Sequence, residues 1–204
     1  RVPADLVEAR AALATARTCY DEVAEAIALA FDLTKDVAKD GERLNAARVV
    51  NSAVAHLVPA ADAAEVALEV AYDDGLTIRA PGNWIDRIVG NLVDNGIRHA
   101  PRGGTIQVTL GREDRDRPGV RIVVADNGPG VPEAERERVF DEGFYKRPGG
   151  KGIGLFIVRH FTVALGGQVH CDERPGGGAA FHVWLPLVLD EPAADDPTEV
   201  TSHG

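Results

Sequence analysis

Apolar residues recur at helical spacing between residues 85 and 100 and predict an amphipathic helix. The expected buried stripe and its edges are formed by Ile85, Ile88, Val89, Leu92, Val93 and Gly96. A Pro-Gly-Asn segment at 81–83 offers a helix start, and a Pro-Arg-Gly-Gly segment at 101–104 ends the pattern.

A second face of this predicted helix is polar and brings together Asn91, Asn95 and Arg98, which are three or four positions apart. Asparagine is a mediocre helix former, because its amide competes with the backbone for hydrogen bonds. Two asparagines one turn apart therefore indicate a ligand. Amide oxygens suit a hard cation such as Mg²⁺, and an arginine suits a phosphate. The alternative is a solvated polar face on an ordinary helix.

Alternation of apolar and polar residues predicts strands at residues 66–72, 76–79, 105–110, 120–125, 168–171 and 179–187. The strands at 105–110 and 120–125, joined by a charged loop, indicate a β-hairpin. Helical spacing predicts further helices at residues 45–58 (ending near Pro59), 133–140 and 153–165.

The N-terminal part of the chain, residues 3–35, is rich in Ala, Glu and Leu and predicts one long helix. Its apolar seam has the alternating spacing of a coiled coil or helical hairpin. Such a helix needs a partner helix or a second copy of itself, and we expect the sequence to be a piece of a longer chain. The alternative is a helix that packs on its own domain. At the other end, residues 190–204 are acidic and aperiodic and predict a disordered tail.

Composition and charge limit the classes of protein to which this sequence can belong. The formal net charge of −10 argues against nucleic acid. No apolar run is long enough to span a membrane, and no signal-peptide pattern opens the sequence. The two cysteines, Cys19 and Cys171, lack partners at metal-binding spacing and are expected to be reduced thiols.

Asp126 follows an apolar strand and begins the segment Asp-Asn-Gly-Pro-Gly. A carboxylate at this place can accept a hydrogen bond from the exocyclic amine of adenine, whereas guanine would present an opposing acceptor. Glycines beside it allow close approach of the backbone to a base. A plain turn is the alternative interpretation.

A second glycine-rich segment, residues 150–155, precedes the helix predicted at 153–165. Backbone N–H groups at a helix start can hold phosphate oxygens. The segment lacks the spacing of the common phosphate-binding loop and of the dinucleotide fingerprint, and alone it is weak evidence of a site.

Taken in order, these segments resemble the Bergerat-type ATP-binding domain of sensor histidine kinases. The N box is similar to residues 91–100, the G1 box to 126–130, the F box to Phe140 with Phe144, the G2 box to 150–155 and the G3 box to 176–181. The resemblance implies a two-layer α/β sandwich with a mixed sheet, preceded by the long N-terminal helix. It divides the chain into a partial dimerisation and phosphotransfer helix (1–40), a catalytic ATP-binding domain (41–189) and the acidic tail (190–204).

The resemblance also implies roles for individual residues in binding ATP and Mg²⁺. Asn95 would coordinate the metal with Asn91 beside it, Arg98 would reach phosphate, His99 would lie beside the adenine, and Asp126 would accept its amine. The residues that would frame the nucleotide are Gly128, Gly130, Gly150, Gly152, Gly154 and Leu155. The lid would span residues 131–151. Its candidate phosphate contacts are Lys146, Arg147 and Lys151, and the alternative is that these three cations are solvated loop charges.

The family's phosphoacceptor histidine, with its acidic neighbour, is missing from this sequence. The histidines are His56, His99, His160, His170, His182 and His203. None lies in residues 1–35 and none precedes an acidic residue, and His160, His170 and His182 are interpreted as structural. The fragment is therefore expected to bind nucleotide without phosphorylating itself.

The partners implied by the resemblance are a response-regulator receiver domain and, through the N-terminal helix, a second copy of the full-length protein. A cytoplasmic domain is implied, with any membrane anchor of the parent protein outside this sequence. Two alternatives stay open. One is another ATPase or serine kinase of the superfamily, although the helix at 85–100 offers only Asp86 and Asp94 as acids. The other is a pseudokinase or dimerisation module.

Overall fold

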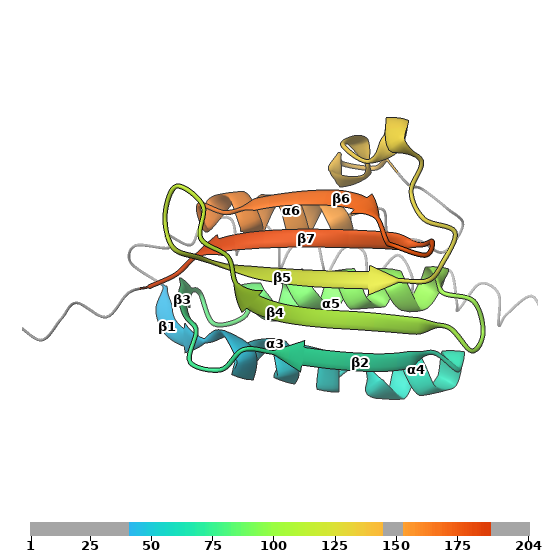
Figure 1. Cartoon of the computed structure of the whole chain (residues 1–204), viewed down its shortest axis with the longest axis horizontal. Helices are drawn as coiled ribbons and strands as arrows, with labels where there is room; N and C mark the ends of the chain where they lie inside the picture. The colour runs from blue at the N-terminus through green and yellow to red at the C-terminus, as the bar shows by residue number, and fades with distance from the viewer. Residues whose placement is uncertain (1–40, 145–152, 189–204) are drawn as a thin grey trace, which may run out of the picture.

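The computed structural model describes residues 41–144 and 153–188. Its centre is a mixed five-stranded sheet with strand order β2-β4-β5-β7-β6 (Figure 1). The strands are β2 (Ala67–Tyr72), β4 (Thr105–Arg112), β5 (Gly119–Asp126), β6 (Gln168–Glu173) and β7 (Ala179–Pro186). Only the pairing of β2 with β4 is parallel; the other pairs are antiparallel.

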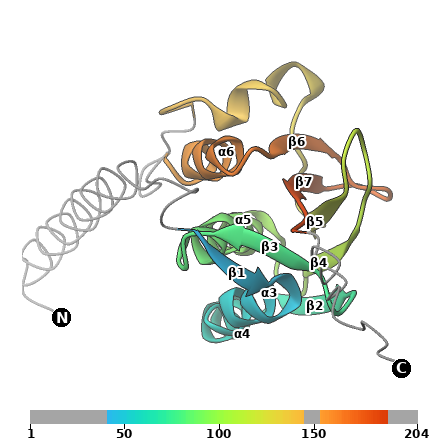
Figure 2. The ribbon, with the colours of Figure 1, turned by 90° about the vertical axis from the view of Figure 1, so that its left-hand side faces the viewer.

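The helices lie on one face of this sheet, as the turned view shows (Figure 2). They are α3 (Ala46–Ala55), α4 (Val58–Ala64), α5 (Trp84–His99) and α6 (Gly154–Ala164). A separate two-stranded sheet pairs β1 (Glu42–Asn45) with β3 (Thr77–Ala80). The predicted two-layer α/β sandwich with a mixed sheet is confirmed.

The central helix α5 buries the predicted apolar stripe. Its residues Ile85, Ile88, Val89, Leu92 and Val93 are all fully buried. Gly96 lets the helix approach the sheet, since an added Cβ would lie 3.0 Å from the Cδ1 of Ile106 on β4. Trp84, at the start of α5, stacks on Phe161 of α6 with ring centroids 4.6 Å apart. This packing fixes the relative position of the two helices that border the candidate site.

The other face of the sheet is partly covered by the loop between β4 and β5. Trp184 on β7 donates its indole N–H to the carbonyl of Glu113 at 2.8 Å, and the guanidinium groups of Arg115 and Arg117 lie 5.4 and 5.5 Å from its ring centre. Gly119 is required here, because a Cβ would overlap the Trp184 ring. The tryptophan is therefore buried although no helix covers this face in the described part of the chain.

Two local predictions are wrong, and one strand was not predicted. Residues 45–58 do not form one helix: α3 runs from Ala46 to Ala55, and the side chain of Asn45 caps it by accepting the Arg48 N–H at 2.8 Å. Pro59 belongs to the first turn of α4, where a missing N–H is tolerated. The helix predicted at 133–140 is two short 3₁₀ turns, Glu133–Glu135 and Arg138–Phe140.

Strand β1 was not predicted, because three of its four residues are exposed and it shows no clear alternation. The predicted N-terminal helix and the predicted tail lie outside the described residues. Within the described residues, no helix is both long and apolar enough to cross a membrane.

Candidate functional site

The polar face of α5 meets the first turn of α6. Asn91 donates its side-chain N–H to the carbonyl of Arg87 at 2.7 Å, one turn earlier on the same helix. Its amide oxygen therefore points away from that carbonyl, toward Gly154, where an added Cβ would lie only 2.9 Å from the oxygen. The structure thus brings together the asparagine of the first predicted box and the last glycine of the box at 150–155.

Asn95 and Arg98 follow Asn91 on α5. Asn95 is half-buried, and Arg98 is exposed. The guanidinium of Arg98 lies 2.8 Å from a carboxylate oxygen of Asp94. Sequence reasoning missed this ion pair. Exposed pairs at this helical spacing contribute only about 0.3–0.5 kcal/mol, so Arg98 is readily released to another anion.

Asp126 is the most deeply buried acid of the described residues, with 2% of its surface exposed at the end of β5. One of its carboxylate oxygens accepts the backbone N–H of Gly128 at 2.8 Å. An ionised carboxylate has about four acceptor positions, so this bond leaves capacity for a further donor. Asn127 next to it accepts the Thr105 N–H at 2.9 Å, which fixes the segment against β4.

Glycines around Asp126 form a cradle of closely packed backbone, in which an added side chain would clash with neighbouring backbone atoms. At Gly128, a Cβ would lie 2.7 Å from the carbonyl oxygen of His99 at the end of α5. Gly130 has a positive φ of 74°, and its Cβ would lie 3.0 Å from the Gly178 carbonyl oxygen. The Cβ of Gly178, with φ of 110°, would overlap the Asp126 carbonyl oxygen. The ends of α5 and β5 and the β6–β7 turn thus meet around Asp126.

Sequence reasoning identified the β6–β7 turn as a glycine box but missed its contact with Asp126. The contact depends on the antiparallel pairing of β5 with β7, in which Ala125 lies opposite Ala180. Asn127 was also missed as a positioning residue. The Asp-Asn-Gly sequence, in which Asn commonly bonds nearby backbone, was its only signal.

The predicted aromatic box adjoins the same region. Phe140 is buried and meets Phe181 of β7 edge to face, with ring centroids 6.1 Å apart. Phe144 is partly buried against the core, and the Arg138 guanidinium lies 4.8 Å from its ring centre. These contacts anchor the segment that leads from β5 toward residue 145.

The predicted site is only partly within the described residues. Gly154 and Leu155 lie in the first turn of α6, and Leu155 packs partly buried against the core. The other members of the predicted lid and glycine box lie outside the described residues: Lys146, Arg147, Gly150, Lys151 and Gly152.

Comparison with known proteins agrees with this arrangement. Residues 80–189, more than half of the chain, match the sequence model of the family described as "Histidine kinase-, DNA gyrase B-, and HSP90-like ATPase". The chain belongs to this family. The match contains both the asparagine face of α5 and the glycine cradle around Asp126.

Curated relatives of this ATPase-family chain are named as sensor kinases. It is 34% identical over 127 residues to the adaptive-response sensory kinase SasA of Synechocystis. This alignment covers 59% of this chain and 33% of that protein. It is 34% identical over 143 residues to the signal transduction histidine-protein kinase AfsQ2 of Streptomyces coelicolor, covering 66% of this chain and 26% of that protein. The chain therefore spans about a third or less of these relatives.

Solved structures show the same fold. The mycobacterial sensor histidine kinase MprB has 28% sequence identity and a TM-score of 0.65, covering 72% of this chain and 97% of that one. Full-length ShkA, in complex with AMPPNP, has 23% identity and a TM-score of 0.75 over 94% of this chain and 41% of that one. The chain is thus a histidine-kinase-type ATPase domain.

Proposed function

We propose that this chain is the catalytic region of a two-component sensor histidine kinase. It binds Mg²⁺-ATP and transfers the γ-phosphoryl group to a histidine outside these residues, from which a response-regulator receiver domain receives it. The observation that carries the proposal is the buried Asp126 within a cradle of glycines, at the meeting point of α5, β5 and the β6–β7 turn.

The buried carboxylate supports recognition of adenine. A carboxylate that is 2% exposed is removed from water, so a hydrogen bond from the exocyclic amine of adenine would meet little competition. Guanine carries an oxygen at that place, and two opposed acceptors in such a pocket are unfavourable. His99, whose carbonyl borders Gly128, is proposed to lie beside the base.

The donor set on α5 fits a hard cation accompanied by phosphate. Asn91 already has its amide N–H engaged with Arg87, which leaves its oxygen toward the first turn of α6. Asn95 is proposed as the metal ligand. Mg²⁺ takes few protein oxygens and keeps waters or phosphate oxygens for the rest of its shell. When bound, it would neutralise charge on the transferred group.

The start of α6 and the cations around it are proposed to hold the phosphates. Backbone N–H groups in the first helical turn are free to bind anions, and the helix dipole favours negative charge there. Gly154 and Leu155 are in this turn. The proposed site also includes Arg98 and the residues Lys146, Gly150, Lys151 and Gly152.

The acids of α5 favour phosphoryl transfer over hydrolysis. A hydrolytic enzyme needs a group that orients or activates water. Asp94 is paired with Arg98 at 2.8 Å, and Asp86, in the first turn of α5, has a buried oxygen without a hydrogen-bond partner. Asp94 is thus already engaged by Arg98, and Asp86 is five positions before Asn91, which is not a neighbouring position on a helix. We therefore expect slow hydrolysis of ATP, no self-phosphorylation, and dimerisation through residues 1–40 in the full-length protein.

A transfer experiment tests the proposal. The 204-residue chain is incubated with γ-labelled Mg²⁺-ATP, alone and with the phosphoacceptor hairpin of a longer form of the protein. Acid-labile, base-stable label is expected on the hairpin only, and the Asn95→Ala variant is expected to reduce transfer strongly. Label on the chain alone, or full transfer by the variant, would overturn the proposal. An Asn51→Ala variant, at an exposed position of α3, is the matched control.

A further inference from the structure

Two histidines and an aspartate lie together on the open face of the sheet, away from the nucleotide site. His170 on β6 is directly paired with His182 on β7, and Asp172 lies two residues further along β6. Alternation along a strand places His170 and Asp172 on the same face, opposite the buried Cys171. The two imidazole rings stack, with centroids 4.7 Å apart and planes within 3°.

The distances between the potential ligand atoms are close to those of a metal site. One carboxylate oxygen of Asp172 lies 3.4 Å from Nε2 of His170 and 3.9 Å from Nε2 of His182. One ligand atom from each of the three residues lies within 4.8 Å of the others. In a tetrahedral Zn²⁺ site with bonds of about 2.0–2.1 Å, ligand atoms are roughly 3.3 Å apart. Because the two rings are stacked in parallel planes, they must rotate out of this arrangement for both nitrogens to face one ion.

We propose that His170, Asp172 and His182 bind a divalent transition-metal ion of the Zn²⁺ class, with the fourth coordination position open to solvent. Two imidazole nitrogens with one carboxylate suit Zn²⁺, whereas Mg²⁺ and Ca²⁺ prefer oxygen ligands only. This site shares no residue with the Mg²⁺ position proposed at Asn95, and it is tested without nucleotide.

The three residues differ in exposure, and the nearest cation is already paired. His182 is the most sheltered of the three, with 19% of its side chain exposed, against 48% for His170 and 56% for Asp172. Arg121 is the nearby opposing charge, and it is paired with Glu113 at 2.9 Å.

Metal binding here would join an edge strand of the sheet to its neighbour. β6 is one of the two edge strands, and the turn that links it to β7 holds Gly178 against Asp126. The ligands sit on paired strands, so the chain loses little freedom when they bind. We therefore expect Zn²⁺ to raise the unfolding temperature of the protein.

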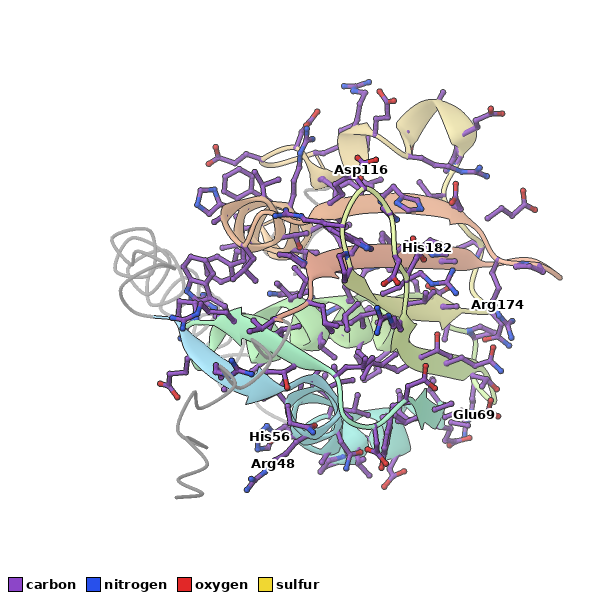
Figure 3. All side chains as sticks on the ribbon, turned by 60° about the vertical axis from the view of Figure 1, so that its left-hand side comes forward. Arg48, His56, Glu69, Asp116, Arg174 and His182 are labelled. Carbon is purple, nitrogen blue, oxygen red and sulfur yellow. The ribbon has the colours of Figure 1, made fainter. Side chains whose placement is uncertain are left out.

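The test uses the 204-residue chain, freed of metal with a chelator and without nucleotide. Zn²⁺ binding is measured by calorimetry for the parent and for His170→Ala, Asp172→Asn and His182→Ala. His56→Ala is the matched control, because His56 is an exposed histidine at the end of α3, far from His182 (Figure 3). Each histidine variant should weaken binding at least about tenfold, since loss of even an outer partner of a ligand weakens metal sites by about 10- to 100-fold.

A spectroscopic measurement accompanies the calorimetry, so that a poorly folded variant does not leave the result open. Co²⁺ in place of Zn²⁺ should give the visible absorption of a four-coordinate site in the parent and in His56→Ala, but not in Asp172→Asn, whose exposed side chain is not needed for folding. Absence of Zn²⁺ binding by the parent would overturn the proposal. Equal binding by the parent and all three ligand variants would overturn it as well.

Discussion

The contact of the β6–β7 turn with Asp126 gives a prediction that separates packing from backbone strain. Gly176 and Gly178 both have strongly positive φ, 91° and 110°. An alanine at either position is therefore strained, by about 1–3 kcal/mol. At Gly176 a Cβ would meet nothing within 4 Å, whereas at Gly178 it would overlap the Asp126 carbonyl oxygen and lie 2.9 Å from the Asn127 Cα.

The additional contact sets the expected difference between the two variants. Overpacking of this kind costs about 1–3 kcal/mol beyond the backbone strain. Gly178→Ala should therefore lower the free energy of unfolding by about 2–6 kcal/mol, and Gly176→Ala by about 1–3 kcal/mol. Total stabilities of domains are about 5–15 kcal/mol, so Gly178→Ala removes a large part of the total.

Urea denaturation followed by circular dichroism measures this difference. With a slope of about 2 kcal/mol per molar urea, a difference of about 2 kcal/mol moves the midpoint by about 1 M. ATP binding, measured on the folded proteins, should weaken in Gly178→Ala more than in Gly176→Ala, because only the first displaces the backbone at Asp126. Equal midpoints and equal ATP affinities for the two variants would refute the reasoning.

Three other predictions concern the rest of the fold. Gly119→Ala should lower the urea midpoint by displacing the Trp184 ring, seen as a red shift of tryptophan fluorescence; an unchanged spectrum would contradict the packing described. Burial raises the pKa of the Cys171 thiol to about 12, so iodoacetamide at pH 8 should label Cys171 only after denaturation, as peptide mass spectrometry would show; rapid labelling of the folded protein would contradict this. Burial, and then His170, lowers the pKa of His182, with Asp172 and Glu113 opposing and Arg121 adding to the effect. The unfolded state then binds more protons than the folded state, so the free energy of unfolding should fall as pH drops through about 6.5. With a chelator present to remove metal ions, this fall should be smaller in His182→Gln, which lacks the imidazole.

Much of the fold follows from local patterns in the sequence. The strands of the main sheet and helix α5 were predicted to within a few residues, because their buried faces impose regular alternation. β1 was not predictable in this way, because its residues are mostly exposed and it exists through its pairing with β3. The two 3₁₀ turns at 133–140 replaced the predicted helix, in a segment of which only Val139 and Phe140 are buried.

The candidate site was predictable where its members are close in sequence. Asp126 with Gly128, and the asparagine face of α5, were proposed from local spacing together with the family resemblance, and their roles stay predictions. The contact of Gly178 with Asp126 was not, since it depends on the register of β5 with β7. For the same reason, His170 and His182 were interpreted as structural residues, and only the pairing of β6 with β7 brings them together with Asp172. The roles assigned to residues 145–152, which lie outside the described residues, remain predictions.

The central claim is that the Asp126 carboxylate recognises the adenine of a bound nucleotide by accepting a hydrogen bond from its exocyclic amine. Calorimetry with Mg²⁺-ATP and Mg²⁺-GTP, on the parent and on Asp126→Asn, tests it most directly. The asparagine side chain can still accept the Gly128 N–H, so the fold should survive. Loss of the charged hydrogen bond to adenine, worth about 1.5–3 kcal/mol, should weaken ATP binding about 10- to 100-fold. The account predicts that the parent prefers ATP and that the variant loses this preference. Equal binding of ATP and GTP by the parent, or an unchanged ATP affinity in Asp126→Asn, would contradict it.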